Sequence, residues 1–398
     1  FLEGDINQAG EMVFENNPLS IVCSLICNHE NQCEGHCVLN RKGSPVHISS
    51  IENYISTTYL DRLKFEKPES NGKMVGIVGS GPAGITIAIE LARRGYDVTI
   101  FESKDKIGGV LRYGIPEFRL PKDIVQKEIS NLKEMGVDIE TNVVIGKTLT
   151  VDELFDEMNF DAVYIGSGAG LPHFMGIEGE SLNGVYSANE FLTRINLMKG
   201  YKFPEYDTPV YVGKNVAVLG GGNVAMDAAR SAKRLGAENV YIVYRRGKEE
   251  LPARAEEVFH AEEEGIEFKL LQNPTKILGN EDGWVNGMEV IKMELGEPDA
   301  SGRRSPVEIP GSEYEMDCDT VIMSLGTSPN PLISSTTKGL ETNRRKCIVA
   351  TEDTGATSKD GVYAGGDAVT GAATVILAMG AGKAAAKGID CLLYTSDA

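Results

Sequence analysis

The chain has 398 residues, of which 41% are hydrophobic and 24% charged, so it can bury a large core and is not a disordered polypeptide. Its 39 Lys and Arg residues against 58 Asp and Glu give a net charge of −19, which argues against a nucleic-acid binder or a polybasic membrane-surface protein. No apolar run reaches the roughly 18 residues of a membrane span, and we expect a soluble, cytoplasmic protein. Glycine is over-used, with 45 residues that lie in short motifs typical of nucleotide-handling α/β enzymes.

Both ends of the sequence look unnatural. The chain opens at Phe1 inside an amphipathic pattern, and its last helical pattern breaks off without a capping residue. We therefore expect a fragment of a longer protein, with residues 392–398 as a non-native tail.

Four of the seven cysteines lie close together near the start of the chain, namely Cys23, Cys27, Cys33 and Cys37. Disulfides are typical of small secreted domains and fit a large glycine-rich chain poorly. Structural zinc usually requires Cys-x-x-Cys pairs, which this chain lacks. Iron–sulfur ligation tolerates the observed spacing and is our leading interpretation. The isolated Cys318 and Cys347 are expected to be small buried hydrophobic residues.

A helix is predicted over residues 46–64, followed by a polar linker over 66–73. Ser49 and Glu52 have the spacing of a capping box at the start of this helix.

The next segment predicts a strand–turn–helix–strand unit with Gly79, Gly81 and Gly84 at its first turn. Such glycines allow a tight turn and the close approach of a pyrophosphate to the N-terminus of the following helix, over residues 85–94. The second strand, 97–102, ends in Glu102, which is placed to bind a pair of ribose hydroxyls.

A second fingerprint, with Gly220 and Gly222, again leads from a strand into a helix that runs to about residue 235. The strand after it, 239–244, ends not in an acid but in Arg245 and Arg246. Paired guanidinium groups would bind a 2′-phosphate, whereas a carboxylate would repel it, so we predict NADP(H) rather than NAD(H). The alternative is that both arginines lie on a solvated loop.

A third motif, Gly366-Asp367, leads into a helix of small residues. Here the sequence resembles the flavoprotein oxidoreductases with two dinucleotide folds, in which a strand ending in Gly-Asp binds the flavin ribityl chain. Asp367 could also be a plain helix cap. Residues 107–121 and the Cys23–Cys37 group resemble the glutamate synthase small-subunit family. They also resemble dihydropyrimidine dehydrogenase and the large subunit of the NADH-dependent ferredoxin–NADP oxidoreductase.

The resemblance implies an α/β fold with two Rossmann-like domains, the nicotinamide domain being inserted into a discontinuous flavin domain. The expected domains are a truncated helical iron–sulfur domain over 1–71, the flavin domain over 72–190 and 327–391, and the NADP(H) domain over 191–326.

It also implies an enzyme that passes electrons from NADPH through FAD to [4Fe–4S] clusters and a partner subunit, with no side chain needed as a general acid or base. The first expectation is the small subunit of NADPH-dependent glutamate synthase, with its large subunit as partner. The alternatives are the large subunit of the bifurcating ferredoxin–NADP oxidoreductase, whose partner is a small ferredoxin-reductase-like subunit, and a non-catalytic flavin-binding assembly subunit. A thioredoxin-reductase type would need a redox Cys-x-x-Cys, which is absent.

The resemblance assigns site residues by position. The residues expected at FAD are Gly79, Gly81, Pro82, Ala83, Gly84, Glu102, Gly109, Arg112, Gly366, Asp367, Ala373 and Thr374. Those expected at NADP(H) are Gly220, Gly222, Asn223, Ala225, Arg245, Arg246 and Arg254. Arg254 could instead be a charged residue in the first turn of a helix that runs to residue 264.

For the clusters, the resemblance implies that Cys27 and Cys33 ligate one cluster and Cys37 the other, with Glu52 as an unusual fourth ligand and Cys23 unused. The upstream cysteines of the family are missing, so neither cluster is expected to be fully ligated by this chain.

Overall fold

The computed structural model describes residues 4–62, 67–299, 302 and 304–395, and the chain divides into two compact units. The first unit comprises residues 1–112, 117–171 and 327–398, and the second comprises 113–116 and 172–326. The chain leaves the first unit along β5 (Leu171–Pro172) and returns to it along β15 (Thr327–Ser328).

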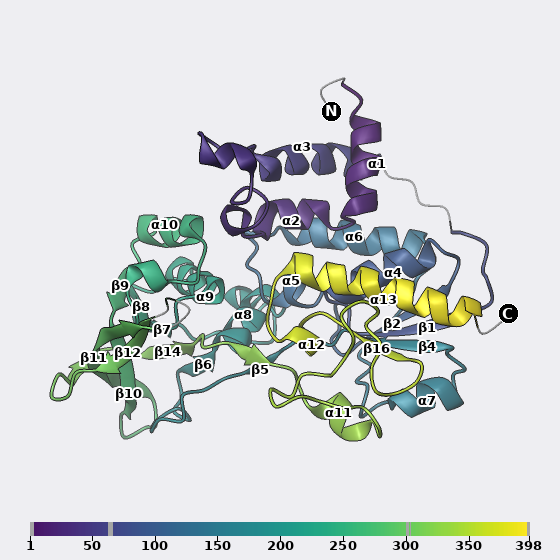
Figure 1. Cartoon of the computed structure of the whole chain (residues 1–398). Helices are drawn as coiled ribbons and strands as arrows, with labels where there is room; N and C mark the ends of the chain where they lie inside the picture. The colour runs from purple at the N-terminus through teal and green to yellow at the C-terminus, as the bar shows by residue number, and fades with distance from the viewer. Residues whose placement is uncertain (1–3, 63–66, 300–301, 303, 396–398) are drawn as a thin grey trace. The chain divides into compact units, whose positions relative to one another are not determined.

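The first unit begins with a helical segment, drawn in purple in Figure 1. Asp5 starts it by accepting a hydrogen bond from the Gln8 amide, as an N-cap residue does. The predicted helix over 46–64 is observed as Ile48–Leu60, and residues 63 and 64 lie outside the described part. The elements of this segment are α1 (Ile6–Asn16), α2 (Ser20–Ile26), η1 (His29–Asn31), η2 (Val38–Arg41) and α3 (Ile48–Leu60).

A parallel five-stranded sheet in the order β16-β4-β1-β2-β3 forms the centre of the first unit. Strand β4 (Ala162–Ile165) pairs with β16 (Val362–Ala364), although residues 172–326 of the second unit lie between them in sequence. The other elements are β1 (Met74–Val78), α4 (Pro82–Ala92), β2 (Asp97–Glu102), α5 (Val110–Tyr113), α6 (Lys122–Glu134), β3 (Asp138–Thr141), α7 (Val151–Asp156), α11 (Leu332–Thr336), α12 (Asp367–Thr370) and α13 (Val375–Thr395).

Helix α4 is buried along nearly its whole length, as its run of small and β-branched residues predicts. Helix α13, yellow in Figure 1, packs along it. Helix α13 continues through residue 395, so part of the predicted tail is helical, and residues 396–398 lie outside the described part.

The second unit contains a parallel sheet of its own in the order β6-β14-β7-β8-β9. Beside it is an antiparallel sheet in which β11 pairs with β10, β12 and β13. The elements are β6 (Val185–Ser187), α8 (Ala188–Asn196), η3 (Gly200–Lys202), β7 (Asn215–Leu219), α9 (Asn223–Arg234), β8 (Asn239–Tyr244), η4 (Lys248–Glu250), α10 (Ala255–Glu263), β9 (Glu267–Leu270), β10 (Gln272–Gly279), β11 (Val285–Pro298), β12 (Arg304–Glu308), β13 (Tyr314–Met316) and β14 (Thr320–Met323).

These two parallel sheets, each flanked by helices, confirm the predicted α/β class with a split first unit. The exact domain boundaries stay predictions. The isolated Cys318 and Cys347 are both buried, as expected. Within the described residues, no helix is both long and apolar enough to cross a membrane.

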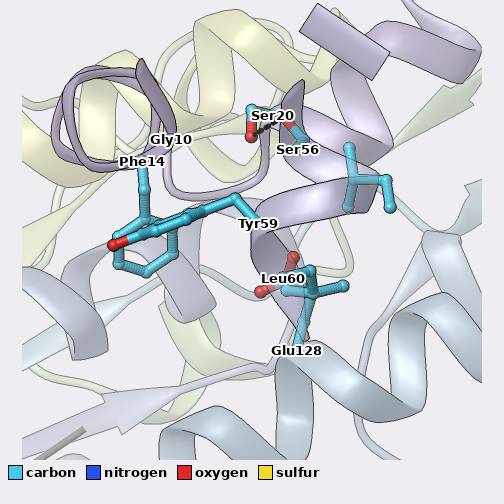
Figure 2. A pocket seen from close by; sticks show the side chains of 8 residues that line it. Gly10, Phe14, Ser20, Ser56, Tyr59, Leu60 and Glu128 are labelled. Carbon is cyan, nitrogen blue, oxygen red and sulfur yellow. Dashed lines mark hydrogen bonds between the residues drawn. The ribbon is translucent and has the colours of Figure 1, made fainter. Parts of the chain in front are cut away.

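A small cavity lies between the helical segment and α6 (Figure 2). Its volume of about 10 Å³ is close to what one water molecule needs. Glu128 of α6 lines it together with Ser20, Ser56 and Tyr59, and the Ser20 and Ser56 hydroxyls lie 2.7 Å apart. Glu128 is 2% exposed, its Oε2 has no hydrogen-bond partner among the described residues, and burial raises the pKa of its carboxyl to about 8.

Candidate functional site

The first glycine-rich loop joins β1 to α4. Gly79 has a φ of +99°, and a Cβ there would lie 2.6 Å from the Gly166 carbonyl oxygen, so the turn requires glycine. A Cβ on Gly84 would overlap the Gly79 carbonyl oxygen, so glycine at this position allows the helix to pack closely against the loop that follows the strand. Gly81 is the N-cap of α4, and a Cβ there would meet no atom within 4 Å, so open space remains at the helix N-terminus. Pro82 is the first residue of this helix, where its fixed φ is favourable.

Ser80, which the sequence patterns did not single out, ties this loop to the end of β2. Its amide and hydroxyl both donate to Glu102 Oε2, at 3.1 and 2.5 Å. Ser103 and Lys104 donate to Oε1, so four protein donors meet the Glu102 carboxylate, which is 6% exposed. Glu102 thus organises the loop in this structure, and its predicted contact with a ribose stays a prediction.

The structure brings three separately predicted motifs together at the start of α4. A Cβ on Gly109 would lie 2.7 Å from the Gly81 Cα, and one on Gly366 would lie 3.0 Å from the Ala83 Cβ. The Gly108 amide also donates to the Ser80 hydroxyl at 2.9 Å. The segments around residues 80, 109 and 366 therefore border one site.

Asp367 is the first residue of α12, which has Gly366 as its N-cap. Its Oδ1 accepts a hydrogen bond from the Ala373 amide at 3.2 Å, just before α13. Burial raises the pKa of Asp367, and this hydrogen bond opposes the effect. Thr374 precedes α13, and Arg112 donates to the Lys122 carbonyl at 3.5 Å.

The second glycine-rich loop joins β7 to α9 with the same backbone plan. Gly220 has a φ of +139°, and a Cβ there would overlap the Ser324 carbonyl oxygen. Gly222 is the N-cap of α9, with only Pro252 at 4.0 Å from a Cβ position. Ala225 in the first turn is fully buried.

A segment that we call the strap, Leu251–Arg254, lies across this second loop. The Ala253 amide donates to the Gly221 carbonyl at 3.1 Å, and the Arg254 amide donates to Asn223 Oδ1 at 2.9 Å. A Cβ on Gly221 would lie 2.8 Å from Leu251 Cδ2, so this glycine makes room for the strap. Asn223, predicted at the nucleotide, holds the strap here.

Arg245 and Arg246 follow directly after β8, as predicted. Arg245 is exposed, and Arg246 is half-buried with an Nε that has no partner among the described residues. Arg254 is the N-cap residue of α10, and its side chain pairs with Glu256 at 2.6 Å. Arg254 therefore stands immediately before the first turn of this helix rather than in it, and its phosphate contact stays a prediction.

The four clustered cysteines differ in environment. Cys23 is buried in α2 with its Sγ 3.6 Å from Met379 Sδ, and a hydrogen bond with Cys27 together with burial raises its pKa. The Cys33 thiol is exposed, 3.5 Å from His29 Nδ1. Backbone amides of Val46 and Leu39 lower the pKa of Cys37.

The predicted capping box between Ser49 and Glu52 is wrong. Glu34 occupies that position instead, since its Oε1 accepts from the Ser49 amide and hydroxyl at 2.9 and 2.7 Å. Glu52 accepts from Asn17 Nδ2 at 3.0 Å, and burial raises its pKa. The Glu34 carboxylate, from the preceding loop, thus takes the hydrogen bond from the Ser49 amide that was predicted for Glu52. The role of Glu52 as a cluster ligand remains a prediction.

The residues present can be tested against the predicted cofactors. Open space at the N-termini of α4 and α9 fits two dinucleotide pyrophosphates, and the unpartnered Arg246 Nε fits an additional phosphate. The thiols have the chemistry of cluster ligands. Among the described residues, no three His, Cys, Asp or Glu side chains lie close enough together to hold a metal ion.

Several contacts that shape these sites were not predicted from the sequence. Ser80 stands between two fingerprint glycines, and a small hydroxyl residue at that place was an available signal. Within the strap, Arg254 was predicted at the nucleotide. The contacts of the strap with Gly221 and Asn223 were not predicted, because they join loops that the fingerprint does not contain. The pairing of Arg254 with Glu256 was not predicted either.

Two family profiles match the sequence. Pyridine nucleotide-disulphide oxidoreductase matches residues 73–382, and dihydropyrimidine dehydrogenase domain II, 4Fe-4S cluster, matches residues 1–63.

Among curated proteins, the chain is 38% identical to the NADP(+)-dependent formate dehydrogenase subunit beta of Moorella thermoacetica, over 98% of this chain and 56% of that protein. It is 36% identical to the glutamate synthase [NADPH] small chain of Escherichia coli, over 97% of this chain and 83% of that one. The chain thus spans little more than half of one relative and most of the other.

Solved structures show the same fold. FprA of Mycobacterium tuberculosis in complex with NADPH superposes with a TM-score of 0.69 at 21% identity, over 82% of this chain and 85% of that one. Thioredoxin reductase of T. acidophilum superposes with a TM-score of 0.59 at 22% identity, over 80% of this chain and 98% of that one.

Proposed function

Because this chain belongs to the pyridine nucleotide-disulphide oxidoreductase family and is an NADPH-dependent flavin oxidoreductase, we propose that it feeds electrons from NADPH, through FAD, toward [4Fe–4S] clusters and a partner subunit. The division into an iron–sulfur domain, a split FAD domain and an inserted NADP(H) domain is part of this proposal.

One observation carries the proposal: two glycine-rich loops of the same plan end their βαβ units differently. The first unit ends in the buried Glu102, and the second ends in Arg245 and Arg246, the latter with a buried Nε that has no partner among the described residues. A carboxylate suits ribose hydroxyls and paired guanidinium groups suit a 2′-phosphate, so the two loops favour different nucleotides.

Bound FAD supplies the chemistry, because a flavin accepts a hydride and releases electrons singly. The residues of this chain would bind and orient the two nucleotides. The N-termini of α4 and α9 would present backbone amides to the two pyrophosphates, and Asp367 would bind the ribityl chain. No general acid or base is required of the protein.

The proposed partner is an oxidoreductase subunit, since the relatives are named small chains or beta subunits. We favour a glutamate synthase large subunit. The similarity to a formate dehydrogenase beta subunit supports the same electron-input role with another partner.

Anaerobic titration of the FAD-loaded chain tests the proposal. NADPH should bleach the flavin absorption at a much lower concentration than NADH does. Failure to retain flavin, or equal titration by both nucleotides, would contradict it. Co-purification with the product of the neighbouring gene would identify the partner.

A further inference from the structure

The side chain of Arg254 is a buried cation at the second glycine-rich loop. Arg254 is 6% exposed, and its Nη2 lies 2.6 Å from Oε2 of Glu256, which is 55% exposed. A buried guanidinium needs a counter-anion, and Glu256 supplies one in this structure.

The backbone of Arg254 is fixed close to the place where a pyrophosphate would bind. Its amide donates to Asn223, the first residue of α9, and Ala253 is tied to Gly221 of the same loop. The hydroxyl of Tyr244 also donates to the Glu250 carbonyl at 2.9 Å, just before the strap. The guanidinium is therefore held within one side-chain length of the helix N-terminus.

Glu256 can leave this pair at little cost. It lies in the first turn of α10, where the helix dipole favours a carboxylate whether or not it contacts Arg254, and more than half of its side chain is already in solvent. An incoming dianion that contacts Arg254 would replace it as the counter-charge.

We propose that Glu256 is an internal counter-ion that the dinucleotide pyrophosphate displaces from Arg254, and that it lowers the affinity for both nicotinamide dinucleotides alike. This inference rests on the proposed function. Arg245 and Arg246, at the end of β8, then select the 2′-phosphate, while the Arg254–Glu256 pair sets overall affinity.

Electrostatics gives the size of the effect. One unit charge about 6 Å from a dianion, in a solvent-like dielectric, changes the dissociation constant roughly three- to tenfold. Screening reduces this change at high salt because Glu256 is exposed.

Isothermal titration of the FAD-loaded full chain with NADP⁺ and with NAD⁺, at low ionic strength, tests the proposal. Glu256→Gln should tighten the binding of both by about three- to tenfold, with their ratio unchanged. Glu263→Gln is the matched control, since it removes the same charge from an exposed position of the same helix. Chemical denaturation of both variants should show unchanged folding.

The inference would be overturned if Glu256→Gln bound the two dinucleotides with the same affinity as Glu263→Gln does. It would also be overturned if Glu256→Gln bound them more weakly than the wild-type chain. Tightening confined to NADP⁺ would also overturn it, because Arg254 would then serve the 2′-phosphate. A wild-type chain that does not prefer NADP⁺ contradicts the proposed function instead, and the response of NAD⁺ binding to Glu256→Gln still decides this inference.

Discussion

The two glycine-rich loops share one backbone plan and differ in the residue between their first two glycines. In the first loop this residue is Ser80, whose hydroxyl joins Glu102 to the Gly108 amide. In the second loop it is Gly221, which has no side chain and so admits the strap.

The difference shows what the shared motif leaves open. Open space remains at the helix N-terminus in both loops, and the residue between the first two glycines determines which neighbouring segment contacts the loop. The Ser80 hydroxyl contacts Glu102 and the Gly108 amide. Gly221 has no side chain, so the strap with its Arg254 can pack against the second loop. Under the proposed function, nucleotide preference would depend on contacts outside the fingerprint.

The largest expected effect breaks the shared plan itself. Gly84→Ala places a Cβ against the Gly79 carbonyl oxygen, which belongs to the backbone and cannot move aside. The substitution should therefore lower the free energy of unfolding by about 3 kcal/mol and abolish flavin binding. Denaturation and flavin content measure both. Gly81→Ala is the control: its Cβ meets open space, so flavin binding should fall while the free energy of unfolding stays unchanged. Equal stability loss in both would contradict the assignment of that space.

Removing the arginines tests the difference at the strand ends. Charge-assisted hydrogen bonds contribute about 1.5–3 kcal/mol each, so replacing Arg245 and Arg246 by Ala should raise the KM for NADPH about 100-fold. The KM for NADH should change little. Steady-state kinetics with both nucleotides measures the two KM values. Equal increases in the KM for NADPH and for NADH would contradict the preference for NADP(H).

Ser80→Ala tests the middle residue. It leaves buried Glu102 without its closest donor, at 2.5 Å, and should cost about 1–2 kcal/mol in the free energy of unfolding. Ser231→Ala in the second unit is the matched control, because the Ser231 hydroxyl is buried without a partner among the described residues. If both variants lose equal stability, the Ser80–Glu102 bond is not what stabilises the first loop.

The two units should also differ in their response to pH. The buried acid Glu257 of the second unit is paired with Arg230 at 2.8 Å. Glu128 in the first unit instead lines the cavity together with Tyr59 (Figure 2). The preceding residue, Lys127, forms an ion pair with Asp61.

Burial raises the pKa of Glu128 from 4.5 to about 8, so the folded chain binds a proton there that the unfolded chain has lost. The free energy of unfolding should therefore fall by about 1 kcal/mol per pH unit as the pH rises from about 5 to 8. Glu128→Gln should flatten this slope, and Glu134→Gln, exposed on the same helix, should not. Denaturation at several pH values measures it, and a slope that survives in Glu128→Gln would exclude this origin.

Sequence patterns sufficed where a local rule decides the structure. The strands Asp97–Glu102 and Asn239–Tyr244 have the predicted bounds, since each is a β-branched and aromatic run between turn residues. The capping box at Ser49 failed because Glu34, fifteen residues earlier, competes for the same amide. The antiparallel sheet around β11 (Val285–Pro298) was not predicted either, since cross-strand pairing depends on partners that a local window does not contain.

The pairing of β4 with β16 has a consequence for the order in which the molecule is made. When the ribosome has synthesised residue 326, the second unit has all its strands, but the first sheet still lacks β16 and the covering helix α13. Until residues 362–364 emerge, β4 is an unpaired parallel edge, able to join another chain. The last tenth of the sequence thus closes a sheet begun near residue 74, so a ribosome that stalls before β16 leaves a nascent chain prone to aggregation.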